Sequence, residues 1–100
     1  RAVINTGAII GECSIINTGA MVEHDSEVGA FSHISPGTIL CGQVKIGAGA
    51  HIGAGSIARQ QITIGDCSLI GAGSVVVKDI PNNVKAYGNP CKVVGRWESI

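Results

Sequence analysis

The feature that most constrains the fold of this chain is an aliphatic residue at every sixth position. The series has thirteen consecutive members: Ile4, Ile10, Ile16, Val22, Val28, Ile34, Leu40, Ile46, Ile52, Ala58, Ile64, Ile70 and Val76. A period of six is neither the 3.6-residue period of a helix nor the alternation of a single strand. It is typical of a parallel β-helix built from hexapeptides, in which three hexapeptides make one triangular coil. We therefore predict an all-β fold, a β-helix of about four coils over residues 1–79, with residues eighteen apart stacked on each other.

Composition agrees with a narrow prism and argues against several classes of function. Only 3% of the residues are aromatic, which suits a prism filled by one Ile or Val per side better than a globular core. Seven basic and seven acidic residues give zero formal charge, so nucleic acid and anionic membranes are not expected as partners. No apolar run approaches the roughly 18 residues that span a bilayer, and no signal-peptide pattern is present.

The four cysteines are not predicted to form disulfides. Cys13 and Cys67 share a column but lie three coils apart, about 14 Å at roughly 4.8 Å per strand layer. A disulfide needs Cα atoms within about 7 Å of each other. Cys41 occupies a different position of the hexapeptide, and Cys91 lies beyond the repeat. Reduced thiols indicate a cytoplasmic protein.

The six-residue rhythm fails after Val77, and residues 80–100 are interpreted as a capping tail. Turn signals come first, followed by three apolar residues at the spacing of one helical face, which predict a short helix over residues 91–100. This helix would cover the open strand edges of the last coil. Because a short prism has flat faces and little buried volume, we expect it to associate with copies of itself as a homotrimer.

Polar residues interrupt the repeat most densely at one corner, where Glu23, His24 and Asp25 follow each other. A corner histidine projects outward, and either adjacent carboxylate could orient its ring as a general base requires. Gly42 comes eighteen residues later, directly above His24, and its N–H could stabilise an oxyanion. A general base at His24 beside an oxyanion donor at Gly42 would be suited to acyl transfer. The spacing alone leaves open the alternative that His24 is an ordinary exposed corner residue.

Two further columns stand out. His33 and His51 are eighteen residues apart and should stack, either as part of a site or as a solvated pair of imidazoles. The second column contains only small residues, namely Thr18, Pro36, Ala54 and Ala72. It predicts a shallow groove whose backbone groups could hydrogen-bond an extended ligand such as pantetheine. A general preference of corners for small residues explains this column equally well.

The motifs around these residues resemble those of a known family. Residues 17–25 read Asn-Thr-Gly-Ala-Met-Val-Glu-His-Asp, and residues 31–37 read Phe-Ser-His-Ile-Ser-Pro-Gly. Both are similar to motifs of bacterial left-handed β-helix sugar acyltransferases of the sialic-acid O-acetyltransferase and UDP-4-amino-sugar N-acetyltransferase type. Residues 71–81 and 88–92 resemble the closing motif of that family, with Cys91 in place of its usual alanine. The resemblance covers nearly the whole chain and implies a left-handed coil.

The resemblance implies that acetyl-CoA, with no metal, donates an acetyl group to an amino or hydroxyl group of a sugar, which can be nucleotide-linked. His24 would be the base that removes the proton of the acceptor, and Asp25 would raise the basicity of His24. Asn17 would position the acceptor or the histidine. The resemblance does not imply which sugar is the acceptor or whether nitrogen or oxygen is acetylated.

On the cofactor side, the resemblance implies that His33 contacts acetyl-CoA near its thioester, with the Gly42 N–H as oxyanion donor. Ala54 and Ala72 would line the path of the pantetheine through their backbone groups. In the family these sites lie between neighbouring subunits of a trimer. Its members also carry an amino-terminal nucleotide-binding domain, which residues 1–100 do not contain. The chain is therefore expected to be the catalytic part alone, or to recognise its acceptor differently.

Two alternative functions compete with acetyl transfer. A γ-type carbonic anhydrase uses the same prism with three zinc-bound histidines, but its closely spaced histidine pair is missing here, where the spacings are nine and eighteen residues. A non-catalytic trimeric β-helix that serves as an assembly module is the second alternative. The adjacent His24 and Asp25 argue against it.

Overall fold

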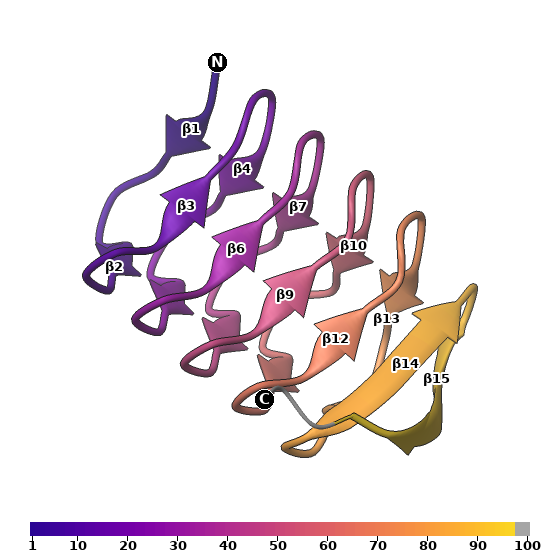
Figure 1. Ribbon diagram of the computed structural model, residues 1–100. Helices are drawn as coiled ribbons and strands as arrows, with labels where there is room; N and C mark the ends of the chain where they lie inside the picture. The colour runs from indigo at the N-terminus through magenta and orange to yellow at the C-terminus, as the bar shows by residue number, and fades with distance from the viewer. Residues whose placement is uncertain (98–100) are drawn as a thin grey trace.

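The computed structural model describes residues 1–97 and shows the hexapeptides wound into a three-sided prism (Figure 1). The first face contains β1 (Val3–Ile4), β4 (Met21–Val22), β7 (Ile39–Leu40), β10 (Ile57–Ala58) and β13 (Val75–Val76). The second face contains β2 (Ile9–Ile10), β5 (Glu27–Val28), β8 (Lys45–Ile46) and β11 (Thr63–Ile64). The third face contains β3 (Ile15–Ile16), β6 (His33–Ile34), β9 (His51–Ile52), β12 (Leu69–Ile70), β14 (Val84–Gly88) and β15 (Cys91–Arg96). The predicted β-helix is confirmed, and its number of coils is close to the prediction.

The register between successive coils is eighteen residues. All pairs among β1 to β13 are parallel, and they match Val3 with Met21 and His33 with His51. The backbone continues the pairing between coils, as in the bond from the N–H of His33 to the carbonyl of Ala50 at 2.9 Å. This register confirms the stacking from which the columns of residues were predicted.

Two positions of each hexapeptide point into the prism. The aliphatic series fills the axis, and from Val22 to Val76 each of its members is at most 4% exposed. Four residues after several of these anchors comes a buried serine or threonine. The Ser32 hydroxyl donates to the carbonyl of Gly47 at 2.7 Å and accepts from the N–H of Ala50 at 3.3 Å. Because buried polar groups need partners, such hydroxyls hold each coil to the next one at the corners.

Replacement of Ser32 by alanine is expected to lower the free energy of unfolding by about 1–3 kcal/mol, because the buried N–H of Ala50 and the partly buried carbonyl of Gly47 lose their partner. The measurement is equilibrium unfolding in denaturant. Thr6 is an exposed corner residue whose hydroxyl makes no hydrogen bond within residues 1–97, so Thr6→Ala is the control. The control should change stability by less than about 0.5 kcal/mol. Equal stability of Ser32→Ala and the parent would contradict the assigned role.

The tail differs from the prediction, because residues 91–96 form strand β15 rather than a helix. Ile80 bridges Ile64, and β14 pairs in parallel with β12, so the coil continues for one more layer. Strand β15 then turns back and pairs with β14 in antiparallel fashion. β14 covers the edge of β12, and its own free edge presents unpaired backbone N–H and C=O groups, which strand β15 satisfies and a helix would not. The last three residues of the predicted helix, 98–100, lie outside the described residues.

Two other expectations concern the cysteine thiols and membrane-spanning segments. The four cysteines are free thiols, of which Cys13 is exposed and Cys91 is buried. Within residues 1–97 there is no helix with the length and hydrophobicity needed to cross a membrane.

Candidate active site

His24 and Asp25 lie on the corner between β4 and β5. The His24 Nδ1 and the Asp25 Oδ2 are 3.2 Å apart, and the two side chains are 63% and 61% exposed. Asp25 has a φ of 59°, in the left-handed region that aspartate tolerates better than most residues. Its carboxylate lies against Gly7 of the preceding coil. Because a carboxylate can only accept, His24 donates through Nδ1, which leaves its Nε2 available to accept a proton.

The structure also decides which carboxylate orients the histidine. Glu23 is held by Asn5 of the preceding coil, whose Nδ2 donates to the Glu23 Oε1 at 2.7 Å. Asp25 alone is within hydrogen-bonding distance of the His24 ring among residues 1–97. The contact between Asn5 and Glu23 was not foreseen, although their separation of eighteen residues is the signal that predicts such a pair.

Gly42, in the next coil, lies against the His24 ring, as the eighteen-residue count predicts. A Cβ at Gly42 would collide with the Nε2 of His24 and would come within 2.7 Å of its Cε1. A Cβ here would have to displace the His24 ring, because the ring lies across the backbone of the next coil; a left-handed φ is not the reason for the glycine. Within residues 1–97 the N–H of Gly42 has no acceptor. The corner thus holds a basic nitrogen beside an unused backbone donor.

A second group of polar side chains lies on the third face. The rings of His33 and His51 have centroids 4.8 Å apart and meet edge to face at 68°. The Asn17 Nδ2 is 3.3 Å from the His33 Nε2, and the Ser35 Oγ is 3.3 Å from the His51 Nε2. Burial, and then the nearby His33, lower the pKa of His51 from its usual value. Both polar partners precede their histidine by sixteen residues, an offset that was not recognised in the sequence.

The small residues form one column along the corner between the third and the first face. The carbonyl of Pro36 accepts from the N–H of Gly55 at 2.9 Å, and the carbonyl of Ala54 accepts from the N–H of Gly73 at 2.8 Å. Within the described part of the chain, the N–H groups of Ala54 and Ala72 have no acceptor. The column therefore offers the N–H groups of Ala54 and Ala72 to a ligand, while the carbonyls of Thr18, Pro36 and Ala54 already have partners.

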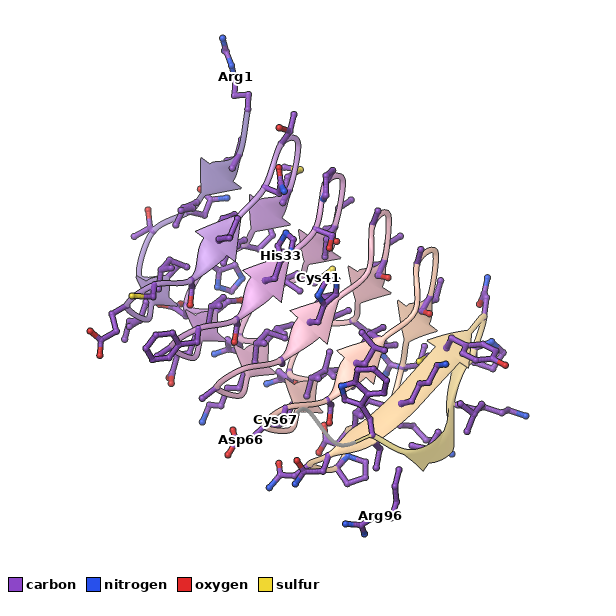
Figure 2. The ribbon with its side chains drawn as sticks, in the orientation of Figure 1. Arg1, His33, Cys41, Asp66, Cys67 and Arg96 are labelled. Atoms are coloured by element: carbon purple, nitrogen blue, oxygen red, sulfur yellow. The ribbon has the colours of Figure 1, made fainter. Side chains whose placement is uncertain are left out.

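The predicted site residues thus fall into two clusters on different corners of one chain. His24, Asp25 and Gly42 follow the first face, whereas Asn17 precedes it and contacts His33, whose side chain stands on β6 of the third face (Figure 2). One face takes six residues, so residues seven apart, such as Asn17 and His24, lie on successive corners. A single chain does not bring His24 and the small-residue column together.

The surface around both clusters is open. Residues 1–97 of a single chain enclose no pocket. Over the same residues, no three side chains of His, Cys, Asp or Glu gather as they would to hold a metal ion. Any ligand of these clusters would therefore lie on a prism edge or between two copies of the chain.

Comparisons with known proteins identify the relatives of this arrangement. No protein-family model and no curated protein matches the chain. Among solved structures, the acetyltransferase domain of PglB from Neisseria gonorrhoeae FA1090 is 40% identical with a TM-score of 0.85, over 93% of this chain and 54% of that one. A histidine-to-alanine mutant of GDP-perosamine N-acetyltransferase from Caulobacter crescentus, in complex with CoA and GDP-perosamine, is 42% identical with a TM-score of 0.93, over 94% and 45%. A maltose O-acetyltransferase from Clostridium difficile 630 is 30% identical with a TM-score of 0.86, over 99% and 68%. The chain spans about half the length of the first two structures.

Proposed function

The chain belongs to the left-handed hexapeptide-repeat acetyltransferases, and we propose on this premise that it transfers the acetyl group of acetyl-CoA to an amino or hydroxyl group of a sugar. The observation that carries the proposal is the His24 ring, which is oriented by Asp25 and lies over the backbone of Gly42. Acyl transfer from a thioester needs a base for the acceptor and a donor for the oxyanion. The relative solved with CoA and GDP-perosamine has one histidine replaced, which supports the choice of a histidine.

In the proposed reaction the His24 Nε2 accepts the proton of the acceptor N–H or O–H. The acceptor nitrogen or oxygen attacks the carbonyl carbon of the thioester, and the electron pair of the C=O bond moves to the oxygen. The N–H of Gly42 would donate to this oxyanion. When the C=O bond re-forms, the C–S bond breaks and the imidazolium returns the proton to the departing sulfur. The products are the acetylated sugar and CoA, with His24 neutral again.

The cofactor is proposed to lie along the second cluster. His33 would contact it near the thioester. The N–H groups of Ala54 and Ala72, which lack acceptors among residues 1–97, would donate to the amide carbonyls of the pantetheine arm. Asn17 would support this side of the site through its contact with His33.

Because the two clusters lie on different corners, we propose that the chain is a homotrimer in which each site takes one cluster from each of two copies. The first face lies between both corners, and its outward residues are all apolar: Val3, Met21, Ile39, Ile57 and Val75. Ile57 is still 38% exposed in the single chain. The corresponding column of the second face includes Glu27, Lys45 and Thr63. An apolar strip flanked by both halves of the site is suited to be covered by a second copy.

Replacement of Ile57 by lysine is expected to dissociate the trimer, because it would place a charge in the apolar strip. The measurement is light scattering after size-exclusion chromatography, in parallel with activity. Thr63→Lys makes the same substitution at the outward position of the second face, in the same coil, and should leave both mass and activity unchanged. A trimer that survives Ile57→Lys, or a parent that is a monomer, would show that the strip is not the interface.

The acceptor is proposed to be a sugar, free or nucleotide-linked, because relatives act on GDP-perosamine and on maltose. These two relatives acetylate nitrogen and oxygen respectively, so their names support both acceptor groups. A cytoplasmic location is part of the proposal, since the four cysteines are free thiols.

The test of the function is the release of CoA thiol from acetyl-CoA in the presence of an acceptor panel: UDP-amino-sugars, a GDP-amino-sugar, sialic acid and maltose. Acceptor-dependent release, with acetylated sugar found by mass spectrometry, is the expected result. Calorimetric titration with CoA alone distinguishes a protein that lacks the acceptor site from one that lacks the cofactor site. A protein that binds no CoA and releases no thiol would favour the non-catalytic assembly module. Stoichiometric zinc with hydration of carbon dioxide would favour the carbonic anhydrase.

A further inference from the structure

The orientation of the Asn17 side chain can be assigned from its two neighbours. The backbone N–H of Thr18 is 2.7 Å from the Asn17 Oδ1. A backbone N–H can only donate, so the atom that faces it must be the amide oxygen and not the nitrogen. The NH₂ group of Asn17 is therefore the end that faces His33, with its Nδ2 3.3 Å from the Nε2. This amide has no second orientation that keeps both contacts.

An NH₂ group can only donate, so the His33 Nε2 must accept and cannot carry a proton. We propose that Asn17 holds His33 in its neutral form with the proton on Nδ1. A hydrogen bond to one ring nitrogen is the usual way in which a protein selects the tautomer of a histidine. Asn17 is then a positioning residue, which acts through the ring of His33 rather than by touching the sugar.

The next coil provides a natural contrast. Ser35 occupies the corresponding place beside His51, with its Oγ 3.3 Å from the His51 Nε2. A hydroxyl can donate or accept, so this contact leaves the tautomer of His51 undetermined. The edge-to-face contact of the two rings also limits the rotation of His33. The arrangement thus selects one tautomer for His33 and does not do so for His51.

The consequence for ligand recognition rests on the proposed function. With its Nε2 occupied by Asn17, His33 has only its Nδ1–H for a ligand, and this group is a donor. The ligand atom at that position must accept a hydrogen bond, and in acetyl-CoA the acceptors in this region are carbonyl oxygens of the thioester and the pantetheine amides.

The tautomer can be read from two-bond ¹⁵N–¹H correlations of the ring nitrogens, recorded well above pH 6.5, the usual pKa of histidine. The chain has three histidines, so His33→Gln and His51→Gln assign the spectrum. We expect a protonated Nδ1 and an unprotonated Nε2 for His33. The opposite pattern in the parent protein would overturn the proposal, whether or not the protein binds CoA.

Variants of Asn17 test whether Asn17 selects the tautomer of His33. Asn17→Leu should shift His33 toward the Nε2–H tautomer, and Asn17→Asp, which can only accept at that position, should do the same. Ser35→Ala is the matched control, and it should change the His51 signals while the His33 tautomer stays as in the parent. We also expect Asn17→Leu to weaken CoA binding by roughly tenfold, about the effect of one hydrogen bond. An unchanged His33 tautomer in a folded Asn17→Leu protein would show that Asn17 does not select it.

Discussion

The His24→Ala variant is expected to transfer acetyl groups roughly 10²- to 10⁴-fold more slowly than the parent, which is the usual contribution of a general base. The side chain is exposed on a corner, so its removal should leave the β-helix intact. CoA binding should persist, because the proposed cofactor contacts lie on the other cluster. The measurement is the initial rate of thiol release at saturating acetyl-CoA, together with the calorimetric affinity for CoA.

Gln60 offers a control for this variant, because it follows His24 and Gly42 in the same column and is also exposed. Gln60→Ala removes a corner side chain of similar size from the next coil and should not change the rate. A His24→Ala protein as active as Gln60→Ala would remove His24 from the proposed role. If CoA binding were lost together with the rate, the base and the cofactor would share His24, and the two-cluster assignment would be wrong.

Gly42→Ala is expected to lower the rate by about 100-fold, because a methyl group there would displace the His24 ring and misplace the base. The variant keeps the backbone N–H, so the loss reports the position of the ring rather than the oxyanion donor. Its φ lies outside the left-handed region, so alanine adds no backbone strain of that kind. The measurements are kcat and the melting temperature.

Two comparisons make this result interpretable. Gly95→Ala adds the same methyl group where, apart from its chain neighbours, no atom of residues 1–97 lies within 4 Å, and it should change neither rate nor stability. The double variant His24→Ala with Gly42→Ala should be no slower than His24→Ala alone, since residues that act through each other are not additive. Fully additive losses would mean that Gly42 acts independently of His24, and a large drop in melting temperature would mean that the substitution damages the fold.

Much of the site could be predicted because the prism converts sequence distance into spatial distance. His24 over Gly42 and His33 beside His51 follow from the eighteen-residue register alone. The choice of Asp25 over Glu23 did not follow, because it depends on Asn5 reaching Glu23 from the preceding coil. The assignment of acetyl transfer to these residues stays a prediction that the experiments above decide.

The tail shows a case in which the local sequence pattern predicts the wrong secondary structure. Three apolar residues at helical spacing predicted a helix, but residues 91–96 pair with β14 instead. The spacing of a short segment describes only its own faces and does not report the unpaired edge that β14, the strand just before it, presents. Satisfying that edge outweighs the weak preference of a segment this short.

The sequence by itself determined the β-helix, its register and the columns of stacked residues, because a strict six-residue period leaves one way to bury an aliphatic side chain on every face. Only the tertiary structure decided that Asn17 meets His33 rather than His24, that Glu23 is held by Asn5 and leaves Asp25 to contact His24, and that the two clusters lie on different corners. These depend on how side chains reach between coils and on which face each corner borders, and neither is contained in the period.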